Sequence, residues 1–469
     1  MSALMVQGAS SWAGKSLVTT ALARALRRRG IDVVPFKAMN MSNNARVVAG
    51  GEIGAAQYLQ ALAAGVEPDA RMNPVLVKPE GDTRSQVVVL GRPDLALSRL
   101  PWRARTPRLW PVIDRALAAL LAAHELVLIE GAGSPAEINL RDSDLANMRT
   151  AAAADARVLL VADIDRGGAF AHLYGTWALL APDERERIAG FVLNRFRGDA
   201  ALLAPGPARL HDLTGIPTLG VLPWLEHGLP DEDGAAAPTV PARGRVVAVV
   251  RYPTASNLDE FKALEQIGVL RWATNPGALD RAELVVLPGS KHVAADLSWM
   301  RRTGLARALC ERVARGGPVL GICGGLQMLG ERIVDEHGVE SSADGLGILP
   351  LDTAFAPAKR TARVATRFGR LAAPWSALAD RPLAGYEIRH GHSEPTDALY
   401  EALPDGLGFA AGPVLGIYVH GLFESPPLLR ALLGAAAPHT LEETFDGLAD
   451  AVEVHLDLDA LLATAGVAR

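Results

Sequence analysis

The first 225 residues alternate short apolar runs with longer stretches of helical periodicity. Each apolar run is brief and ends at Gly, Asp, Asn, Lys, Glu or Leu before a polar turn, which predicts a buried strand. The expected strands are residues 4–8, 33–37, 126–130, 158–163, 190–194 and 218–222. Such alternation indicates βαβ units and a mostly parallel sheet, with functional groups at the carboxyl ends of the strands.

A second series of apolar runs begins near residue 245. Its expected strands are residues 245–251, 284–288, 318–323 and 414–420. Between the two series, residues 227–243 are rich in Pro, Ala, Gly and acidic residues, which is typical of a linker. We therefore expect an α/β fold with one domain over residues 1–240, a second over 241–436, and a helical tail over 437–469.

Composition narrows the class of protein. A chain of 469 residues with 49% hydrophobic and 21% charged residues is typical of a soluble globular protein of two or three domains. A net charge of -5 gives no support to a nucleic-acid partner, and no apolar stretch is long enough to predict a membrane span. With only two cysteines and no secretory signal, we expect a reducing, cytoplasmic setting.

The sequence GASSWAGKS over residues 8–16 follows the first predicted strand and precedes a helix. This context predicts a phosphate-binding loop for ATP, built from Gly8, Ser11, Gly14, Lys15 and Ser16. Lys15 would reach the terminal phosphate, and the Ser16 hydroxyl would bind Mg²⁺. The spacing from Gly8 to Gly14 is one residue longer than in the common pattern. The alternative is a chance glycine-rich turn between a strand and a helix.

A phosphate loop needs an acidic partner for magnesium at a neighbouring strand end. Glu130 closes the run LVLIE and is one candidate, and Glu52, which opens the predicted helix EIGAAQYLQ, is a second. Lys37 ends the second strand, where it could meet a carboxylate or a phosphate. Asn194 could hydrogen-bond a base edge of the nucleotide. Each of these four residues could instead be a surface or turn residue.

The run GGPVLGICGGLQMLG places Cys323 between a buried strand and a helix, with glycines on both sides. This is the nucleophile-elbow arrangement in cysteine form. The amino end of a helix favours a thiolate, and the Gly324 amide could stabilise an oxyanion. A buried structural cysteine is the alternative. Cys310, within a helical pattern, is expected to be inert packing.

A cysteine nucleophile also needs a base, and the chain has 11 histidines. His420 follows the apolar run VLGIYV at a predicted strand end, which makes it the best candidate. His390 and His392 are rivals that could instead line a substrate cleft. Gly289, in the turn LPGS after another strand, could supply a second amide to the oxyanion.

With these residues in view, the chain resembles the cobyric acid synthase family over essentially its whole length. GICGGLQMLG and YVHGLFE resemble the nucleophile and histidine motifs of class I glutamine amidotransferases. That class commonly has a Glu two residues after the histidine, where this chain has Leu422. The narrower branch often lacks the acid, so the third catalytic group stays open, and Glu424 is not an obvious replacement.

The first domain is similar to the dethiobiotin-synthetase type of phosphate-loop fold, which tolerates the longer glycine spacing. FKAMNMSNNARV, the long run from EIGAAQYLQ to VVVLG, and LPGSKHVAADLSWM resemble motifs of the cobyric acid synthase family. This resemblance implies ATP, glutamine and a corrinoid as reactants. It implies adenosylcobyrinic acid a,c-diamide as the acceptor, amidated at its b, d, e and g carboxylates.

The resemblance implies two coupled reactions. Cys323 would attack glutamine with His420 as base, and an acceptor carboxylate would be activated by ATP as an acyl phosphate that ammonia then displaces. The alternatives are cobyrinic acid a,c-diamide synthase, a ligase acting on a cell-wall lipid, a partition-type ATPase, and a glutamine-binding module without catalysis. Arg84, Arg141 and Arg166 are conceivable corrinoid contacts, although exposed arginines are common.

Overall fold

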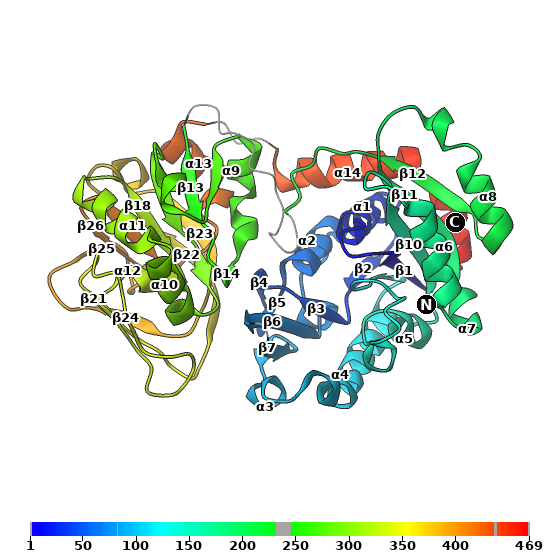
Figure 1. Cartoon of the computed structure of the whole chain (residues 1–469), viewed down its shortest axis with the longest axis horizontal. Helices are drawn as coiled ribbons and strands as arrows, with labels where there is room; N and C mark the ends of the chain where they lie inside the picture. The colour runs from blue at the N-terminus through cyan, green and yellow to red at the C-terminus, as the bar shows by residue number, and fades with distance from the viewer. Residues whose placement is uncertain (1, 82, 231–244, 436–438, 468–469) are drawn as a thin grey trace.

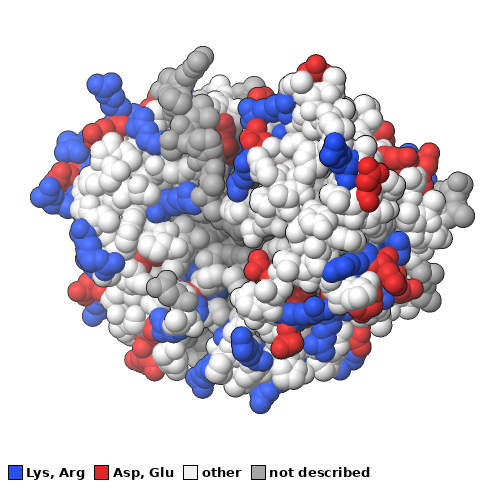
Figure 2. Space-filling view, turned by 45° about the vertical axis from the view of Figure 1, so that its right-hand side comes forward, with Lys and Arg blue, Asp and Glu red and all other residues white. Residues whose placement is uncertain are grey.

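The computed structural model describes residues 2–81, 83–230, 245–435 and 439–467. Figure 1 shows two bodies side by side, and both chain termini lie on the same one. The predicted linker, residues 227–243, falls mostly outside the described residues. No helix within these ranges is both long and apolar enough to span a bilayer. Basic and acidic side chains are interspersed on the face shown in Figure 2.

The first body is built on a six-stranded parallel sheet of order β12-β11-β10-β1-β9-β2. Its interior strands are almost wholly buried, as expected for a parallel sheet covered on both faces. All six strands match the sequence prediction to within two residues at either end. Their bounds are Ser2–Gly8 (β1), Val33–Phe36 (β2), Leu126–Glu130 (β9), Arg157–Asp163 (β10), Ile188–Phe196 (β11) and Thr218–Pro223 (β12).

Helices cover both faces of this sheet, and the longest of them pack directly on it. The helices of the first body are α1 (Lys15–Arg28), α2 (Ala55–Ala64), α3 (Leu95–Ser98), α4 (Trp102–Ala123), α5 (Met148–Ala153), α6 (Ala169–Leu179), α7 (Pro182–Arg185) and α8 (Gly206–Thr214). The apolar face of α1 buries Val18, Leu22 and Leu26 against the sheet. This packing fixes the position of the loop that precedes α1.

Short strands inserted after β2 project toward the second body (Figure 1). They form a four-stranded sheet and a separate hairpin: β3 (Met39–Met41), β6 (Val75–Gly81), β7 (Arg84–Val89) and β8 (Arg92–Pro93), with β4 (Ala45–Val48) and β5 (Gly51–Gly54). The helical prediction for residues 52–54 is wrong. Val47 and Val48 pair with Glu52 and Gly51 across a tight turn, so the helix begins only at Ala55.

The second body has a seven-stranded sheet of order β15-β13-β16-β18-β27-β26-β25. The first five strands are parallel and the last two antiparallel. Their bounds are Val247–Val250 (β13), Leu270–Ala273 (β15), Leu284–Leu287 (β16), Val319–Ile322 (β18), Tyr400–Leu403 (β25), Gly408–Ala411 (β26) and Val414–Ile417 (β27). The sequence predicts His420 at the end of this strand. Because β27 ends at Ile417, His420 lies instead in the segment that follows the strand.

Smaller elements surround this sheet. The helices are α9 (Lys262–Gln266), α10 (Val293–Arg302), α11 (Leu305–Ala314), α12 (Gly324–Leu329) and α13 (Pro426–Leu433). The strands are β14 (Ala255–Ser256), β17 (Gly289–Ser290), β19 (Arg332–Val334), β20 (Ala343–Asp344), β21 (Leu351–Ala354), β22 (Arg360–Arg367), β23 (Pro382–Arg389) and β24 (His392–Pro395). The β22–β23 hairpin contacts β4 of the first body.

The C-terminal segment returns to the first body. Helix α14 (Leu441–His455) packs on α1 and β12, and α15 (Leu458–Thr464) packs on β11. Phe445, Leu448 and Val452 of α14 join the apolar cluster of α1. Arg24 and Arg28 of α1 pair with acidic residues of α14. The tail is helical, as predicted, and it forms part of the first body.

Candidate functional site

The predicted phosphate loop follows the central strand β1. Gly14 adopts a φ of 99°, and α1 begins at the next residue, Lys15. The Lys15 Nζ donates to the Gly133 carbonyl at 3.1 Å. The Asn194 amide donates to the Ala13 carbonyl at 3.0 Å from a buried position, so in this structure it braces the phosphate loop and does not line the cavity.

Glu130 is the centre of a buried polar cluster beside this loop. Its Oε1 accepts hydrogen bonds from the Ser16 hydroxyl at 2.9 Å and from the Lys37 Nζ at 2.8 Å. Its Oε2 accepts from the Gln60 amide. These residues meet because β9 lies between β1 and β2 in the sheet. The structure therefore brings together Lys15, Ser16, Lys37 and Glu130, as their strand-end positions suggest.

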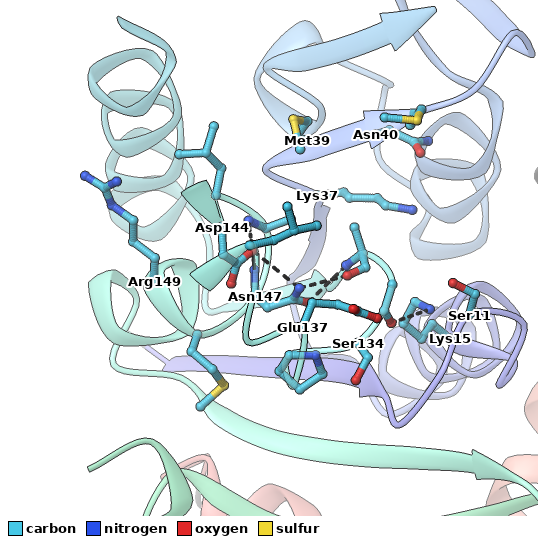
Figure 3. Close-up of a pocket in the computed structure, with 18 of the residues that line it drawn as sticks. Ser11, Lys15, Lys37, Met39, Asn40, Ser134, Glu137, Asp144, Asn147 and Arg149 are labelled. Atoms are coloured by element: carbon cyan, nitrogen blue, oxygen red, sulfur yellow. Dashed lines mark hydrogen bonds between the residues drawn. The ribbon is translucent and has the colours of Figure 1, made fainter. Parts of the chain in front are cut away.

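A cavity of about 920 Å³ opens in front of the loop (Figure 3). Ser11, Lys15 and Ser16 line one end, and the segment after β9 lines the other. In that segment Asn147 donates to the Ala132 carbonyl at 2.8 Å and accepts from its N–H at 3.1 Å, which fixes the cavity wall. A volume of this size lies within the range of small-molecule and cofactor sites.

Two oxygen donors at this loop, the Ser16 hydroxyl and the Glu130 carboxylate, fit a magnesium ion. Magnesium prefers hard oxygen ligands and usually takes the rest from phosphates and water. Glu52, the second candidate ligand, is not brought to this site. Both of its carboxylate oxygens are bound by Lys78 and Lys359 at the contact between the two bodies, because Glu52 lies on the β5 hairpin.

The backbone of Gly14 gives a direct test of the loop. A Cβ at this position would lie 2.0 Å from the Asn194 Nδ2, and the left-handed φ adds a strain of about 1–2 kcal/mol for any other residue. We expect Gly14→Ala to weaken ATP binding at least about 10-fold in calorimetric titrations. Gly198→Ala is the matched control, since Gly198 has a φ of 101° with no atom within 4 Å of its Cβ position. Equal effects of both changes would contradict a specific role for Gly14.

In the second body Cys323 stands between β18 and α12. Its φ of 52° and ψ of -108° form the sharp turn that the flanking sequence predicts. Its N–H donates to the Ile417 carbonyl at 2.7 Å, and its thiol lies 3.5 Å from the Ile388 carbonyl. A non-glycine residue held in such a conformation is strained, and strain of this kind is common at nucleophiles.

His420 is buried beside Cys323 and is held by a carboxylate. Its Nδ1 lies 2.8 Å from the Glu260 Oε1, and the Glu260 Oε2 accepts from the Gly421 N–H at 2.9 Å. Burial lowers the pKa of His420, but the Glu260 charge and the Cys323 thiol outweigh it and raise this pKa to about 10. The imidazole therefore carries a proton at neutral pH, beside the thiol.

Glu260 is not among the candidates expected from the sequence. It lies in η4 (Leu258–Phe261), 160 residues before His420 in the chain. The expected position after the histidine holds Leu422, and Glu424 binds Arg46 instead of His420. The only signal in the sequence is the pair of acids, Asp259 and Glu260, between Leu258 and Phe261, and it gives no indication of their partners.

The two glycines proposed for an oxyanion site lie around Cys323. A Cβ on Gly289 would lie 3.1 Å from the His420 Cε1, and one on Gly324 would lie 2.7 Å from the Ser290 N. Gly324 is the first residue of α12. The Gly289 backbone therefore lies against the His420 ring and that of Gly324 against Ser290, with little room for a side chain at either position.

A small pocket in front of Cys323 is lined by residues of both bodies. Gln327, Glu340 and Lys359 come from the second body, and Asn43 and Lys78 from the first. Lys78 and Lys359 both line this pocket and both pair with Glu52. Although burial would raise the pKa of Glu52, Lys359 and Lys78 lower it to about 2, so the carboxylate stays charged.

The other histidines and cysteine take different places. His390 lines the Cys323 pocket, and burial together with Lys359 and Lys291 lowers its pKa to about 4. His392 is exposed on β24. Cys310 is exposed on α11, so the expectation that it packs inside is wrong. It faces solvent because the buried side of α11 is formed by Leu305, Ala306 and Leu309.

The three arginines considered as contacts for a large acceptor lie in different places, and only one of them lines the cavity. Arg141 lines the cavity of the first body and pairs with Glu184 at 2.8 Å. Arg166 lies 3.5 Å from Asp163 and is 60% exposed. Arg84 does not line that cavity. Glu137, Asp144 and Arg149 do line it, and they follow the strand end at Glu130, where polar residues of a parallel sheet gather.

Comparisons with known proteins cover both bodies. The family of CobQ/CobB/MinD/ParA nucleotide binding domains matches residues 4–229, and the CobB/CobQ-like glutamine amidotransferase domain matches residues 246–428. The predicted fold class is thereby confirmed.

Curated relatives match nearly the whole chain. A cobyric acid synthase of Polaromonas sp. (strain JS666 / ATCC BAA-500) is 54% identical over 499 residues, covering 98% of each chain. One of Variovorax paradoxus (strain S110) is 56% identical over 470 residues, again covering 98% of each. A third, of Polaromonas naphthalenivorans (strain CJ2), is 54% identical and covers 97% of each.

Proposed function

Because the chain belongs to the cobyric acid synthase family, we propose that it amidates the b, d, e and g carboxylates of adenosylcobyrinic acid a,c-diamide. The chain is a glutamine-dependent, ATP-using amide ligase. The proposal is supported by one observation on this chain's own residues. The chain has a complete cysteine, histidine and glutamate arrangement in one body and an assembled phosphate loop in the other.

The glutaminase reaction is assigned to Cys323, His420 and Glu260. The thiolate attacks the side-chain amide of glutamine, and the Gly289 and Gly324 amides stabilise the oxyanion that forms. The protonated His420 then donates its proton to the departing nitrogen, and Glu260 holds the ring in position. Water releases glutamate from the thioester, with His420 now accepting a proton.

The synthetase reaction is assigned to the phosphate loop and the cavity in front of it. A carboxylate is a poor electrophile, so the acceptor is first phosphorylated by ATP, and ammonia displaces the phosphate. Lys15 neutralises charge on the phosphoryl group that is transferred. Ser16 and Glu130 would hold magnesium, which supplies further charge neutralisation when bound. Lys37 keeps Glu130 in position.

Ammonia made at Cys323 has to reach the acyl phosphate in the other body. Free ammonia is mostly protonated near neutral pH and then loses its nucleophilicity, so an enclosed route preserves it. Asn43 and Lys78 of the first body line the Cys323 pocket, which supports direct transfer across the contact between the bodies. Both cysteines are free thiols, which supports a cytoplasmic location.

Mass spectrometry of the acceptor tests the proposed function. With ATP, Mg²⁺ and glutamine, adenosylcobyrinic acid a,c-diamide is expected to lose about one mass unit per amide in four steps, since a hydroxyl is replaced by an amino group at each. Incubations without ATP are the control. No mass change alongside intact glutamine hydrolysis would assign the chain another acceptor.

Replacing Glu260 tests the third member of the glutaminase site. Without the carboxylate charge, only the Cys323 thiol opposes the effect of burial, so the pKa of His420 falls below its value of about 10. We expect Glu260→Gln to lower kcat for glutamine hydrolysis about 10²-fold and to move the alkaline limb of its pH profile to lower pH. Glu265→Gln, a partly exposed acid paired with Lys262, is the control. An unchanged pH profile would contradict this role for Glu260.

A further inference from the structure

Arg46 of the first body reaches into the second body. It lies on β4 and its side chain is buried. The Nε donates to the Asp259 Oδ2 at 2.9 Å, and the Nη1 donates to the Glu424 Oε2 at 2.9 Å. The Nη2 donates to both carboxylates. A single guanidinium therefore joins two acidic residues that are far apart in the sequence.

Both acidic partners belong to the segments that carry the glutaminase residues. Asp259 immediately precedes Glu260 in η4. Glu424 ends η7 (Leu422–Glu424), which starts directly after Gly421, whose N–H is bound by Glu260. The guanidinium thus ties together the two segments whose relative position sets the contact between Glu260 and His420.

Tyr386 extends this contact to the imidazole itself. The Arg46 guanidinium lies 5.0 Å from the centroid of the Tyr386 ring, which stacks on His420 with ring centroids 5.1 Å apart and planes 16° apart. The Tyr386 hydroxyl accepts a hydrogen bond from the Asn257 amide at 2.7 Å. The same amide donates to the Ala45 carbonyl of the first body at 3.0 Å.

An ordinary docking ion pair is the simpler account of an arginine at such a contact. The pair of Arg363 and Glu67 is of that kind, since both side chains are more than half exposed. Arg46 differs because its side chain is only 8% exposed and that of Asp259 only 1%. Removing the arginine would leave a buried carboxylate without its counter-charge next to Glu260, and such changes are strongly disruptive.

We propose that Arg46 is a positioning residue for the glutaminase reaction, through which the docked synthetase body completes the Cys323–His420–Glu260 site. The inference rests on the proposed function. Arg46 touches no reacting atom, and it acts by holding Asp259, Glu424 and Tyr386. Glutamine is then hydrolysed at full rate only when the body that consumes ammonia is in place.

Arg46→Met and Asp259→Asn test the proposal together. We expect each to lower kcat for glutamine hydrolysis about 10-fold, within the range for residues that couple two sites, and to leave ammonium-driven amidation within about two-fold. Arg46→Lys should recover only part of the rate, because an ammonium group cannot bridge both carboxylates in the same geometry. The double variant should lose little beyond either single change, since both remove one contact.

Arg363→Gln is the matched control at the same contact between the bodies. If it lowers glutamine hydrolysis as much as Arg46→Met, Arg46 serves only docking and the proposal is overturned. Loss of ammonium-driven amidation in both Arg46→Lys and Asp259→Asn would overturn it as well, because the effect would then not be confined to the glutaminase site.

Alkylation of Cys323 gives a readout that docking alone would not move. In a Cys310→Ser background, which removes the exposed thiol, the pH dependence of iodoacetamide reaction reports the thiol and imidazole pair. We expect Arg46→Met to shift that dependence and Arg363→Gln to leave it unchanged. Identical profiles for the parent protein and Arg46→Met would overturn the proposal. This measurement needs no corrinoid, so it stays informative if the acceptor is another molecule.

Discussion

The variant Cys323→Ala is expected to lose glutamine-driven amidation completely and to retain amidation driven by ammonium salt. Cys323 is the only thiol at the His420 contact, so no other described side chain can form the thioester. The phosphate loop lies in the other body and depends on none of the contacts of Cys323. The rate with glutamine should fall by at least about 10⁴-fold, and the rate with ammonium at mildly alkaline pH should stay within a few-fold.

The measurement is acceptor mass against time with each nitrogen source. Cys310→Ser serves as the control, because that thiol is exposed and remote from His420. Loss of amidation with both nitrogen sources would show that Cys323 is structural, and a thermal melt would then reveal the lower stability. Retention of glutamine-driven amidation would assign the glutaminase reaction to other residues.

The variant Lys15→Ala is expected to have the complementary phenotype. It should strongly lower the rate of amidation with either nitrogen source, because acyl phosphate formation precedes the use of ammonia. The loss should be on the order of 10²- to 10³-fold, as for removal of one charged donor at a developing anion. Glutamine hydrolysis should persist, since Lys15 lies at the phosphate loop and contacts Gly133 of the same body.

Mixing the two variants sharpens both predictions. Lys15→Ala releases ammonia from glutamine, and Cys323→Ala can use it only after it has passed through solution. With glutamine and ATP at neutral pH we expect the mixture to stay far below the parent protein, and added ammonium salt to restore amidation. Full activity of the mixture without added ammonium would argue against direct transfer of ammonia between the bodies.

Much of this fold could be predicted because its signals are local. The six strands of the first sheet are short apolar runs, and their pairing follows from the βαβ pattern. The hairpin of β4 and β5 could not be recognised in the same way. The run from Glu52 to Gln60 reads as one continuous helix, and only pairing with residues 45–48 keeps residues 51–54 extended.

The site residues likewise differ in whether their positions follow from local sequence or from contacts between distant segments. Lys15, Ser16 and Cys323 lie in strand–turn–helix segments. The geometry of these segments is determined by neighbouring residues, so the sequence identifies all three. Glu260 depends on a contact with His420 that only the folded chain creates. Glu52 is the reverse case. The sequence suggests it as a magnesium ligand, but its hairpin places it at the contact between the two bodies, where it pairs with Lys78.

The return of α14 and α15 to the first body makes the glutaminase an insertion that is tethered at both ends. The chain crosses from residue 230 to residue 245 and back from residue 435 to residue 439. Because α14 packs on α1 through Phe445, Leu448 and Val452, loss of the C-terminal segment would uncover an apolar side of α1 in the first body, although that segment follows the glutaminase in the chain.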